Sequence, residues 1–361
     1  YEDLEPVLSI FVMIRQSNIE LLRLLSMFAL LFLHFYTHSL LPSEVYVSQT
    51  GFWKNFPIVV SSVTSLQVNI FILISGWFGI HTTPKKIISF YLLCAFYGVF
   101  TYLLSLGLDN SFSIRDLAIS FMPFSAMEGW WFVKAYLCLM LLAPLFNKAI
   151  DNMSRREFLY VLLALVFINS FLGFFFKQEI NKNVHNFMQL MYVYFIGRYL
   201  ALYLNVEKQK LRKWTAIISI CSVALYALVW IFNDNYLHLV KSCTFLSRNN
   251  LWSLFNSIVI FLFFTTVRFE SKTINWLAKG AFAVYLVHTS VWIRSAWYGN
   301  LTNIYAENHP ALAWLIVSAI FVVYFIGVLC FDPLRIVITK PVENKLTDWC
   351  NIVIERIKKN K

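Results

Sequence analysis

Two ionisable residues, Arg23 and His34, stand eleven positions apart in a stretch that is otherwise almost entirely apolar. Eleven residues make about three turns of an α-helix, so both side chains would lie on one face, roughly 16 Å apart along the axis. That distance is about half the thickness of a bilayer core. Because an ionisable group in lipid costs several kcal/mol unless it faces a partner or water, the pair predicts one polar pathway along this helix.

The two residue types suit different chemical tasks. The guanidinium of Arg23 is permanently charged and can hold a phosphate or a carboxylate through two hydrogen bonds. The imidazole of His34 suits proton transfer near neutral pH. Glu20 lies three residues before Arg23 and is expected to pair with it within the helix. The pattern predicts a donor with an anionic head at Arg23 and a long arm that reaches His34.

The composition identifies the elements that must position this pair. Hydrophobic residues make up 59% of the chain and charged residues 14%, well below the roughly 25% charged content of soluble domains. We therefore predict an all-α polytopic integral membrane helix bundle with about ten transmembrane helices. Ten apolar segments approach the roughly 20 residues that cross a bilayer; they cover residues 20–41, 56–80, 87–108, 129–147, 158–176, 186–205, 213–233, 251–268, 274–293 and 311–331.

The ninth of these segments carries the weakest signal. Its first half contains Asn275, Lys279 and Gly280. This helix is therefore expected to begin late or to be partly interfacial.

The distribution of lysine and arginine predicts the orientation. About 20 of them fall on the side of the N-terminus and about seven on the opposite side, with Arg248 in the smaller group. The excess marks the cytoplasmic side, so we expect a multi-pass protein of the cytoplasmic (inner) membrane with both termini in the cytoplasm. This bias and anionic membrane lipids account for the net charge of +11, and no nucleic-acid partner is needed. Residues 1–340 are predicted to form one membrane domain and residues 341–361 a basic cytoplasmic tail.

Several site types are excluded by their missing motifs. The six cysteines lie mostly within apolar runs and lack zinc-type spacing, so no metal site is predicted. Neither a Gly-rich phosphate loop nor a Gly-x-Ser-x-Gly nucleophile elbow is present. The sequence gives no indication of the oligomeric state.

Four segments, taken together, point to a known family. They are the Arg-x10-His spacing from Arg23 to His34, residues 69–78, residues 130–132 with 144–147, and residues 281–288. In this order they resemble the first helix, the end of the second helix, the fourth helix and the late Tyr-Leu-x-His segment of the bacterial acyltransferase-3 family. The resemblance extends from about residue 17 to about residue 335.

The resemblance implies an enzyme that transfers an acyl group, usually acetyl from cytoplasmic acetyl-CoA, to a hydroxyl of a cell-surface or lipid-linked polysaccharide. His34 would then activate the acceptor hydroxyl or relay the acyl group, and Arg23 would orient the donor. The remaining candidates are Ser75, Lys85 and Lys86 for donor binding, and Glu128, Trp131, Tyr285 and His288 for binding the glycan or glycolipid acceptor.

One departure from the family concerns the donor phosphates. Family members often carry arginines just after the Ser-Gly turn, where this chain has Lys85 and Lys86. Lysine attracts a phosphate as a point charge and lacks the bidentate fork of arginine.

Each candidate also has a purely structural explanation. Intramembrane histidines hydrogen-bond across helix bundles, and arginines extend to lipid headgroups. Ser75-Gly76 is expected to be a helix terminus, where glycine supplies the backbone freedom. Trp131 fits an interfacial aromatic belt, and Lys85 and Lys86 fit the charge bias.

Two other functions compete with acyl transfer by this family. A transporter or flippase for a glycan or lipid would also use about ten helices and intramembrane charges, but no inverted repeat is evident. The second alternative is an enzyme of the membrane-bound O-acyltransferase type, which modifies proteins or lipids and also relies on a buried histidine. The position of His34 beside Arg23 on the first helix argues against that assignment.

Overall fold

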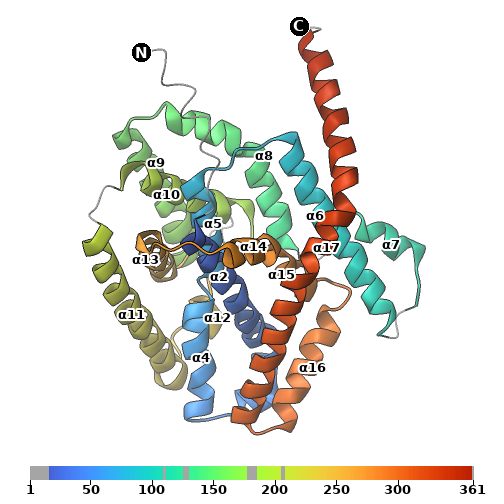
Figure 1. Cartoon of the computed structure of the whole chain (residues 1–361). Helices are drawn as coiled ribbons and strands as arrows, with labels where there is room; N and C mark the ends of the chain where they lie inside the picture. The colour runs from blue at the N-terminus through green and yellow to red at the C-terminus, as the bar shows by residue number, and fades with distance from the viewer. Residues whose placement is uncertain (1–15, 109–110, 125–129, 177–184, 205–207, 360–361) are drawn as a thin grey trace.

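The computed structural model describes residues 16–108, 111–124, 130–176, 185–204 and 208–359. Within these ranges the chain forms helices and connecting turns, without a strand (Figure 1). The α-helices are α2 (Ser17–Phe35), α3 (Glu44–Val47), α4 (Phe52–Thr64), α5 (Gln67–Phe78), α6 (Pro84–Leu106), α7 (Ile114–Ser120), α8 (Trp131–Asp151), α9 (Arg155–Val166), α10 (Phe187–Tyr203), α11 (Lys208–Phe232), α12 (Ser242–Phe245), α13 (Leu251–Thr266), α14 (Lys272–Leu277), α15 (Ala281–His288), α16 (Arg294–Glu307) and α17 (Pro310–Lys359). Three π-helical segments, Tyr36–Leu40, Phe167–Phe175 and Asn233–Leu237, extend α2, α9 and α11, and a 3-10 turn at Ala278–Gly280 joins α14 to α15.

Seven helical segments among the described residues are long and apolar enough to cross a membrane. Each overlaps a segment predicted from the sequence, which confirms the all-α polytopic membrane bundle. They are Ser17–Leu40, Phe52–Phe78, Pro84–Leu106, Trp131–Asp151, Arg155–Phe175, Lys208–Leu237 and Pro310–Ile357.

The other three predicted segments form shorter helices. Helix α10 has 17 residues and α13 has 16. The ninth segment is broken into α14, the 3-10 turn and α15, so its apolar helix begins only at Ala281. This late start follows from Lys279 and Gly280, which interrupt the apolar run.

Two elements were not expected from the apolar pattern. Helix α16 lies between the ninth and tenth predicted segments; its polar composition gave no hydrophobic signal. Helix α17 does not end near residue 331 but continues through Pro333 and Pro341 to Lys359. Its last part, which includes most of the predicted basic tail, projects beyond the body of the bundle (Figure 1).

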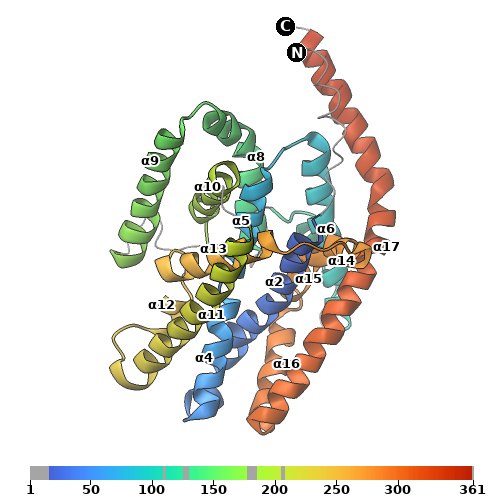
Figure 2. The same cartoon turned by 60° about the vertical axis from the view of Figure 1, so that its left-hand side comes forward.

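Helix α2, which carries Arg23 and His34, lies in the middle of the bundle (Figures 1 and 2). It contacts α4, α5, α13, α14 and α15. Its first turn is tied to the neighbouring chain, since Asn18 Nδ2 donates to the Phe264 carbonyl at 2.8 Å and Ser17 Oγ accepts from the Ser271 N–H at 2.9 Å. These bonds fix α2 in a central position from which both candidate residues reach the interior.

Helix α5 packs against α10 more closely than any side chain would permit. A Cβ atom placed on Gly76 would lie 2.3 Å from the Tyr194 carbonyl oxygen, and one on Gly197 would lie 2.6 Å from the Leu73 carbonyl oxygen. The helix itself ends two residues later, at Phe78, and the next residue is Gly79, whose φ of +72° favours glycine. The expectation that Ser75-Gly76 forms the helix terminus is therefore wrong: Gly76 allows close helix packing, and Gly79 supplies the stop.

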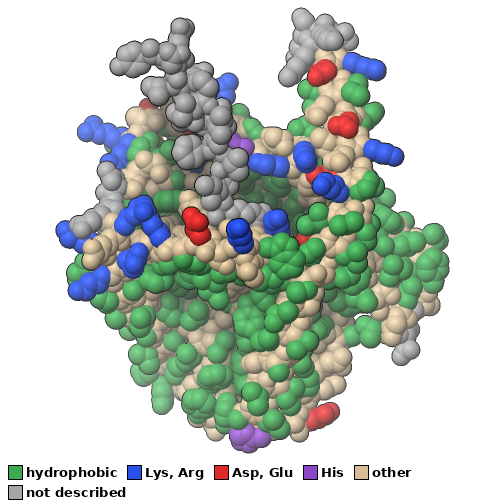
Figure 3. Space-filling view, in the orientation of Figure 1, with side chains coloured by type: hydrophobic (Ala, Val, Ile, Leu, Met, Phe, Trp, Pro, Cys, Tyr) green, Lys and Arg blue, Asp and Glu red, His purple; other side chains and the backbone are tan. Residues whose placement is uncertain are grey.

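The surface has the character of a membrane protein. Figure 3 shows lysine and arginine side chains near the end from which α17 projects, above flanks that are mostly hydrophobic. Large apolar side chains on these flanks, such as Ile220, Leu228 and Val323, are strongly exposed. Exposed apolar area of this extent is typical of surfaces that contact lipid.

Candidate active site

Arg23 is held in the bundle by the carboxylate predicted to pair with it. Its Nη1 donates to Glu20 Oε2 at 2.9 Å, one turn earlier on α2. The Glu20 side chain is 9% exposed and that of Arg23 is 30% exposed. The pair therefore has an interior carboxylate and a guanidinium that reaches accessible space.

That space is a cavity of about 430 Å³, which we call the mouth. It is bounded by the end of α5, the first half of α8, the first turns of α6 and part of α17. Its polar lining includes Arg23, Ser75, His81, Lys86 and Arg335. Three cationic side chains thus surround one cavity, an arrangement that favours an anionic ligand.

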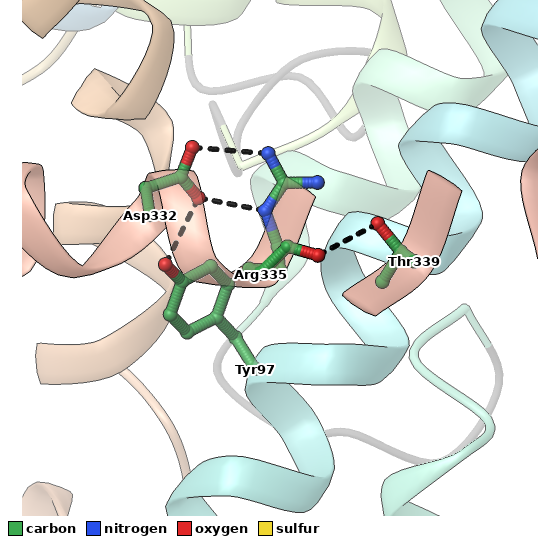
Figure 4. A network of polar contacts seen from close by, with 4 residues as sticks. All are labelled: Tyr97, Asp332, Arg335 and Thr339. Atoms are coloured by element: carbon green, nitrogen blue, oxygen red, sulfur yellow. Dashed lines mark hydrogen bonds and ion pairs between the residues drawn. The ribbon is translucent and has the colours of Figure 1, made fainter. Parts of the chain in front are cut away.

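Arg335 is fixed at the mouth by the buried Asp332 (Figure 4). Its Nε and Nη2 donate to the two carboxylate oxygens at 2.7 and 3.0 Å, and Tyr97 of α6 donates to the same carboxylate at 2.9 Å. Thr339 donates to the Arg335 carbonyl at 3.0 Å. The sequence reading did not single out Arg335, because it lies beyond the last apolar segment among other basic residues.

The two adjacent lysines face different surroundings. Lys86 lines the mouth, and its Nζ donates to the His81 carbonyl at 2.7 Å. The Lys85 Nζ lies 4.0 Å from a carboxylate oxygen of Glu343 on α17 and is not part of the mouth lining. The structure therefore brings Lys86, but not Lys85, to the cavity that contains Arg23.

A second cavity, the middle cavity, lies next to the mouth. It measures about 310 Å³, and its lining includes Arg23, Ser75 and Tyr136, which also line the mouth. Ser75 Oγ lies 3.3 Å from the Tyr136 hydroxyl. Lys279 of the 3-10 turn adds another cation to this lining.

Beyond the middle cavity lies a smaller inner chamber of about 30 Å³. Phe71, Phe132 and Phe282 line both spaces, so the chamber continues the same route. The remaining lining of the chamber is Met27, Leu30, His34, Val68, Trp131, Arg248 and Tyr285. The three cavities follow α2 from Arg23 to His34, the direction that their spacing predicted.

His34 is oriented by a second histidine from a distant part of the sequence. Nδ1 of His34 lies 2.9 Å from Nε2 of His288, and Nδ1 of His288 faces the Val284 carbonyl oxygen. A carbonyl only accepts, so His288 carries its hydrogen on Nδ1 and accepts from His34 with Nε2. In neutral His34 the hydrogen is then on Nδ1 and the lone pair on Nε2. This arrangement leaves His34 with a nitrogen able to take a proton.

On the far side of His34 from Arg23 lies His38. The two rings are 5.5 Å apart, and the His38 ring lies 4.8 Å from that of Tyr298. His38 is exposed, although His34 is partly buried. An exposed ring therefore lies next to His34 at the end of α2 opposite to Arg23.

The candidates for acceptor binding have different positions. Trp131 and Tyr285 line the inner chamber, so Trp131 is not merely part of a surface belt. His288 is fully buried and contacts His34. Glu128 lies outside the described residues.

Arg248 is the chamber residue that the sequence reading missed. It was counted among the positive charges of the outer loops, yet its side chain lines the chamber together with His34. The available signal was the polar run Ser247-Arg248-Asn249-Asn250 directly before the apolar α13, since asparagine side chains can anchor a loop inside a bundle.

The described residues contain no group of three or more histidine, cysteine, aspartate or glutamate side chains that could hold a metal ion. The cations of the mouth can bind an anion, and His34 can transfer a proton.

The sequence comparisons agree with this chemistry. The acyltransferase-3 family model, which describes an acyltransferase domain, matches residues 16–331. No curated protein and no solved structure matches the chain significantly. The matched range contains Arg23, all of the inner chamber and most of the mouth, and it favours an acyltransferase over a transporter. The chain therefore belongs to the acyltransferase-3 family and is a membrane acyltransferase.

Proposed function

We propose that the protein transfers an acetyl group from cytoplasmic acetyl-CoA to a hydroxyl of a cell-surface or lipid-linked polysaccharide. The observation that carries this proposal is the series of three adjoining cavities, with shared lining residues, between the cationic mouth and His34. The anionic head of the donor would bind at Arg23, Lys86 and Arg335, and its long, narrow arm would extend through the middle cavity toward His34. The distance of roughly 16 Å along α2 suits a pantetheine arm.

The small inner chamber supports acetyl as the acyl group. Its volume of about 30 Å³ is small beside those of the mouth and the middle cavity, about 430 and 310 Å³. Five aromatic side chains line it, namely Phe71, Trp131, Phe132, Phe282 and Tyr285. Because these rings leave little room near His34, a two-carbon acyl group fits better than a long chain.

In this mechanism His34 is a general base. The acceptor hydroxyl gives its proton to Nε2 of His34 while its oxygen bonds to the thioester carbonyl carbon. The carbon–sulfur bond then breaks, and His34 returns the proton to the sulfur to give free CoA. The bond to His288 holds the imidazole in the orientation and tautomer that this transfer needs.

The acceptor enters, in this proposal, from the side of His38. This exposed ring next to His34 and Tyr298 supports a route from the outer face, opposite to the donor mouth. The protein would lie in the inner membrane with both termini cytoplasmic, which agrees with the gathering of Lys and Arg near the end that carries the last part of α17 (Figure 3). Anionic lipid headgroups would contact these basic residues.

Mass spectrometry of surface glycans tests the proposal. We compare cells with the wild-type gene, without it, and with the H34A variant, and expect acetylated glycan only with the wild type. In parallel, membranes that contain the protein receive acetyl-CoA labelled in its acetyl group, and label in the glycan is measured. Equal acetylation with the H34A variant, or glycan movement across the membrane without acetylation, would contradict an acetyltransferase.

A further inference from the structure

The loop that carries Arg248 is built into the bundle. The Arg248 carbonyl accepts from Asn69 Nδ2 at 3.0 Å and from Gln189 Nε2 at 3.1 Å. The next residue, Asn249, is 1% exposed and donates to the Asn169 carbonyl at 2.9 Å. Asn250 caps α13 and donates to the Tyr226 hydroxyl at 3.1 Å. Side chains of three helical segments and a main-chain carbonyl of a fourth therefore fix the position of this loop, as a functional site requires.

The side chain of Arg248 leads from this loop into the inner chamber. Its guanidinium carbon lies 4.8 Å from the centre of the Trp131 ring, which is a cation–π contact. Arg248 and Trp131 line the chamber together with His34 and Tyr285. The guanidinium is therefore held beside the imidazole that would act as the base.

Among the described residues, no carboxylate forms an ion pair with Arg248. Arg23 and Arg335, by contrast, each pair with a carboxylate on their own helix. A cation within a membrane protein is costly unless negative charge or water accompanies it. The chamber thus holds a positive charge whose natural partner is a ligand atom that is negative or becomes negative.

We propose that Arg248 is a catalytic residue whose guanidinium binds the carbonyl oxygen of the acetyl thioester. This inference rests on the proposed acetyl transfer. When the acceptor oxygen bonds to the carbonyl carbon, the electron pair of the C=O π bond moves to the carbonyl oxygen, and Arg248 stabilises that oxyanion. The pair returns to re-form C=O as the carbon–sulfur bond breaks, and the proton passes from the acceptor through His34 to the sulfur.

The position of Arg248 favours the carbonyl oxygen over an anionic group of the acceptor. Arg248 and His34 line the same small chamber, so a thioester placed for attack assisted by His34 brings its carbonyl oxygen to the guanidinium. Preorganised donors that face a developing oxyanion in a site without bulk water typically contribute about 10²–10³-fold to kcat. The guanidinium of Arg248, which has no carboxylate partner within the described part of the chain and packs on Trp131, has the properties of such a donor.

Infrared difference spectroscopy tests the contact directly. The H34A protein, which should hold the thioester without consuming it, is loaded with acetyl-CoA that carries ¹³C at the thioester carbonyl. We expect the carbonyl band at lower frequency than in solution, because a bond from the guanidinium weakens C=O. With R248M added, the band should return toward its frequency in solution. An unchanged band would overturn the proposal, since a structural role does not polarise the carbonyl.

Kinetics of otherwise wild-type protein provide the second test. For R248M we expect kcat to fall about 10²–10³-fold, with little change in the dissociation constant of acetyl-CoA, and for R248K a smaller fall. The control R115M removes an exposed arginine of α7 and should leave kcat unchanged. A higher KM for the acceptor at constant kcat would assign Arg248 to an anionic acceptor group and overturn the proposal.

The variants are expected to fold, because Asn69 and Gln189 bond to the main-chain carbonyl of residue 248, which every substitution keeps. If R248M nevertheless does not purify as a stable protein, R248K takes its place in the infrared measurement, with a smaller band shift expected. The proposed function is tested separately from the role of Arg248. It is wrong if the wild-type protein binds acetyl-CoA but transfers no acetyl group.

Discussion

The mouth and the inner chamber both contain arginine, but they hold it differently. In the mouth, Arg23 and Arg335 are each paired with a carboxylate three residues earlier on the same helix. In the chamber, Arg248 packs on Trp131 and has no carboxylate partner among the described residues. Carboxylate pairing fixes a cation in place before a permanently charged ligand arrives. An arginine without a carboxylate partner is instead able to stabilise a negative charge that forms on the substrate only during the reaction.

The largest effect expected within this comparison concerns His34 in the chamber. His34→Ala should lower kcat for acetyl transfer by about 10²–10⁴-fold, while the dissociation constant of acetyl-CoA stays close to that of the wild type. Rapid-quench kinetics and equilibrium binding in nanodiscs measure the two quantities. His309→Gln, at an exposed histidine far along the chain, is the matched control. If His34→Ala weakened acetyl-CoA binding by the same factor as it lowered kcat, donor binding in the mouth and chemistry in the chamber would not be separate.

Gly76 should affect both regions together, because α5 carries Ser75 of the mouth and Phe71 of the chamber. In Gly76→Ala the new Cβ would meet the Tyr194 carbonyl oxygen at 2.3 Å. Overpacking of this kind costs roughly 1–3 kcal/mol, so the thermal midpoint in detergent should fall. Gly299→Ala, where nothing lies within 4 Å, should leave the midpoint unchanged or raise it. Equal midpoints for the two variants would show that α5 and α10 separate freely.

Arg23→Lys tests donor binding at the mouth. Lysine keeps the charge but loses the fork, so we expect KM for acetyl-CoA to rise about tenfold, or ~1.4 kcal/mol, with kcat largely kept. Steady-state kinetics with varied donor measure both. Arg212→Lys, which alters an arginine bonded to the Thr266 carbonyl outside the cavities, serves as control. An unchanged KM for Arg23→Lys would mean that Arg23 only extends toward the headgroups.

The smallest effect separates the two adjacent lysines. Lys86→Ala removes a cation of the mouth lining and should raise KM for acetyl-CoA about fivefold, equivalent to ~1 kcal/mol. Lys85→Ala removes only the pair with Glu343, outside the mouth, and should change KM little. Both constants come from the same donor titration at low and high salt, and the Lys86 effect should shrink as salt rises. Equal effects of the two substitutions would contradict the mouth as the binding site.

The sequence predicted the elements better than their ends or their packing. All seven long apolar spans were evident from composition, because lipid requires long apolar helices. Helix α16 was missed because its polar face gives no apolar run. Gly76 was assigned to a helix end because its true reason, the close approach of α10, depends on a residue more than a hundred positions away.

The sequence by itself determined the membrane bundle and the line from Arg23 to His34, since helical periodicity is local and eleven residues fix both face and distance. Only the tertiary structure decided what surrounds His34. His288 reaches it from 254 positions away, and Arg248 reaches the same chamber from a loop that looked external. Such contacts depend on how helices pack and where polar loops find hydrogen-bond partners, and no local pattern in the chain encodes that arrangement.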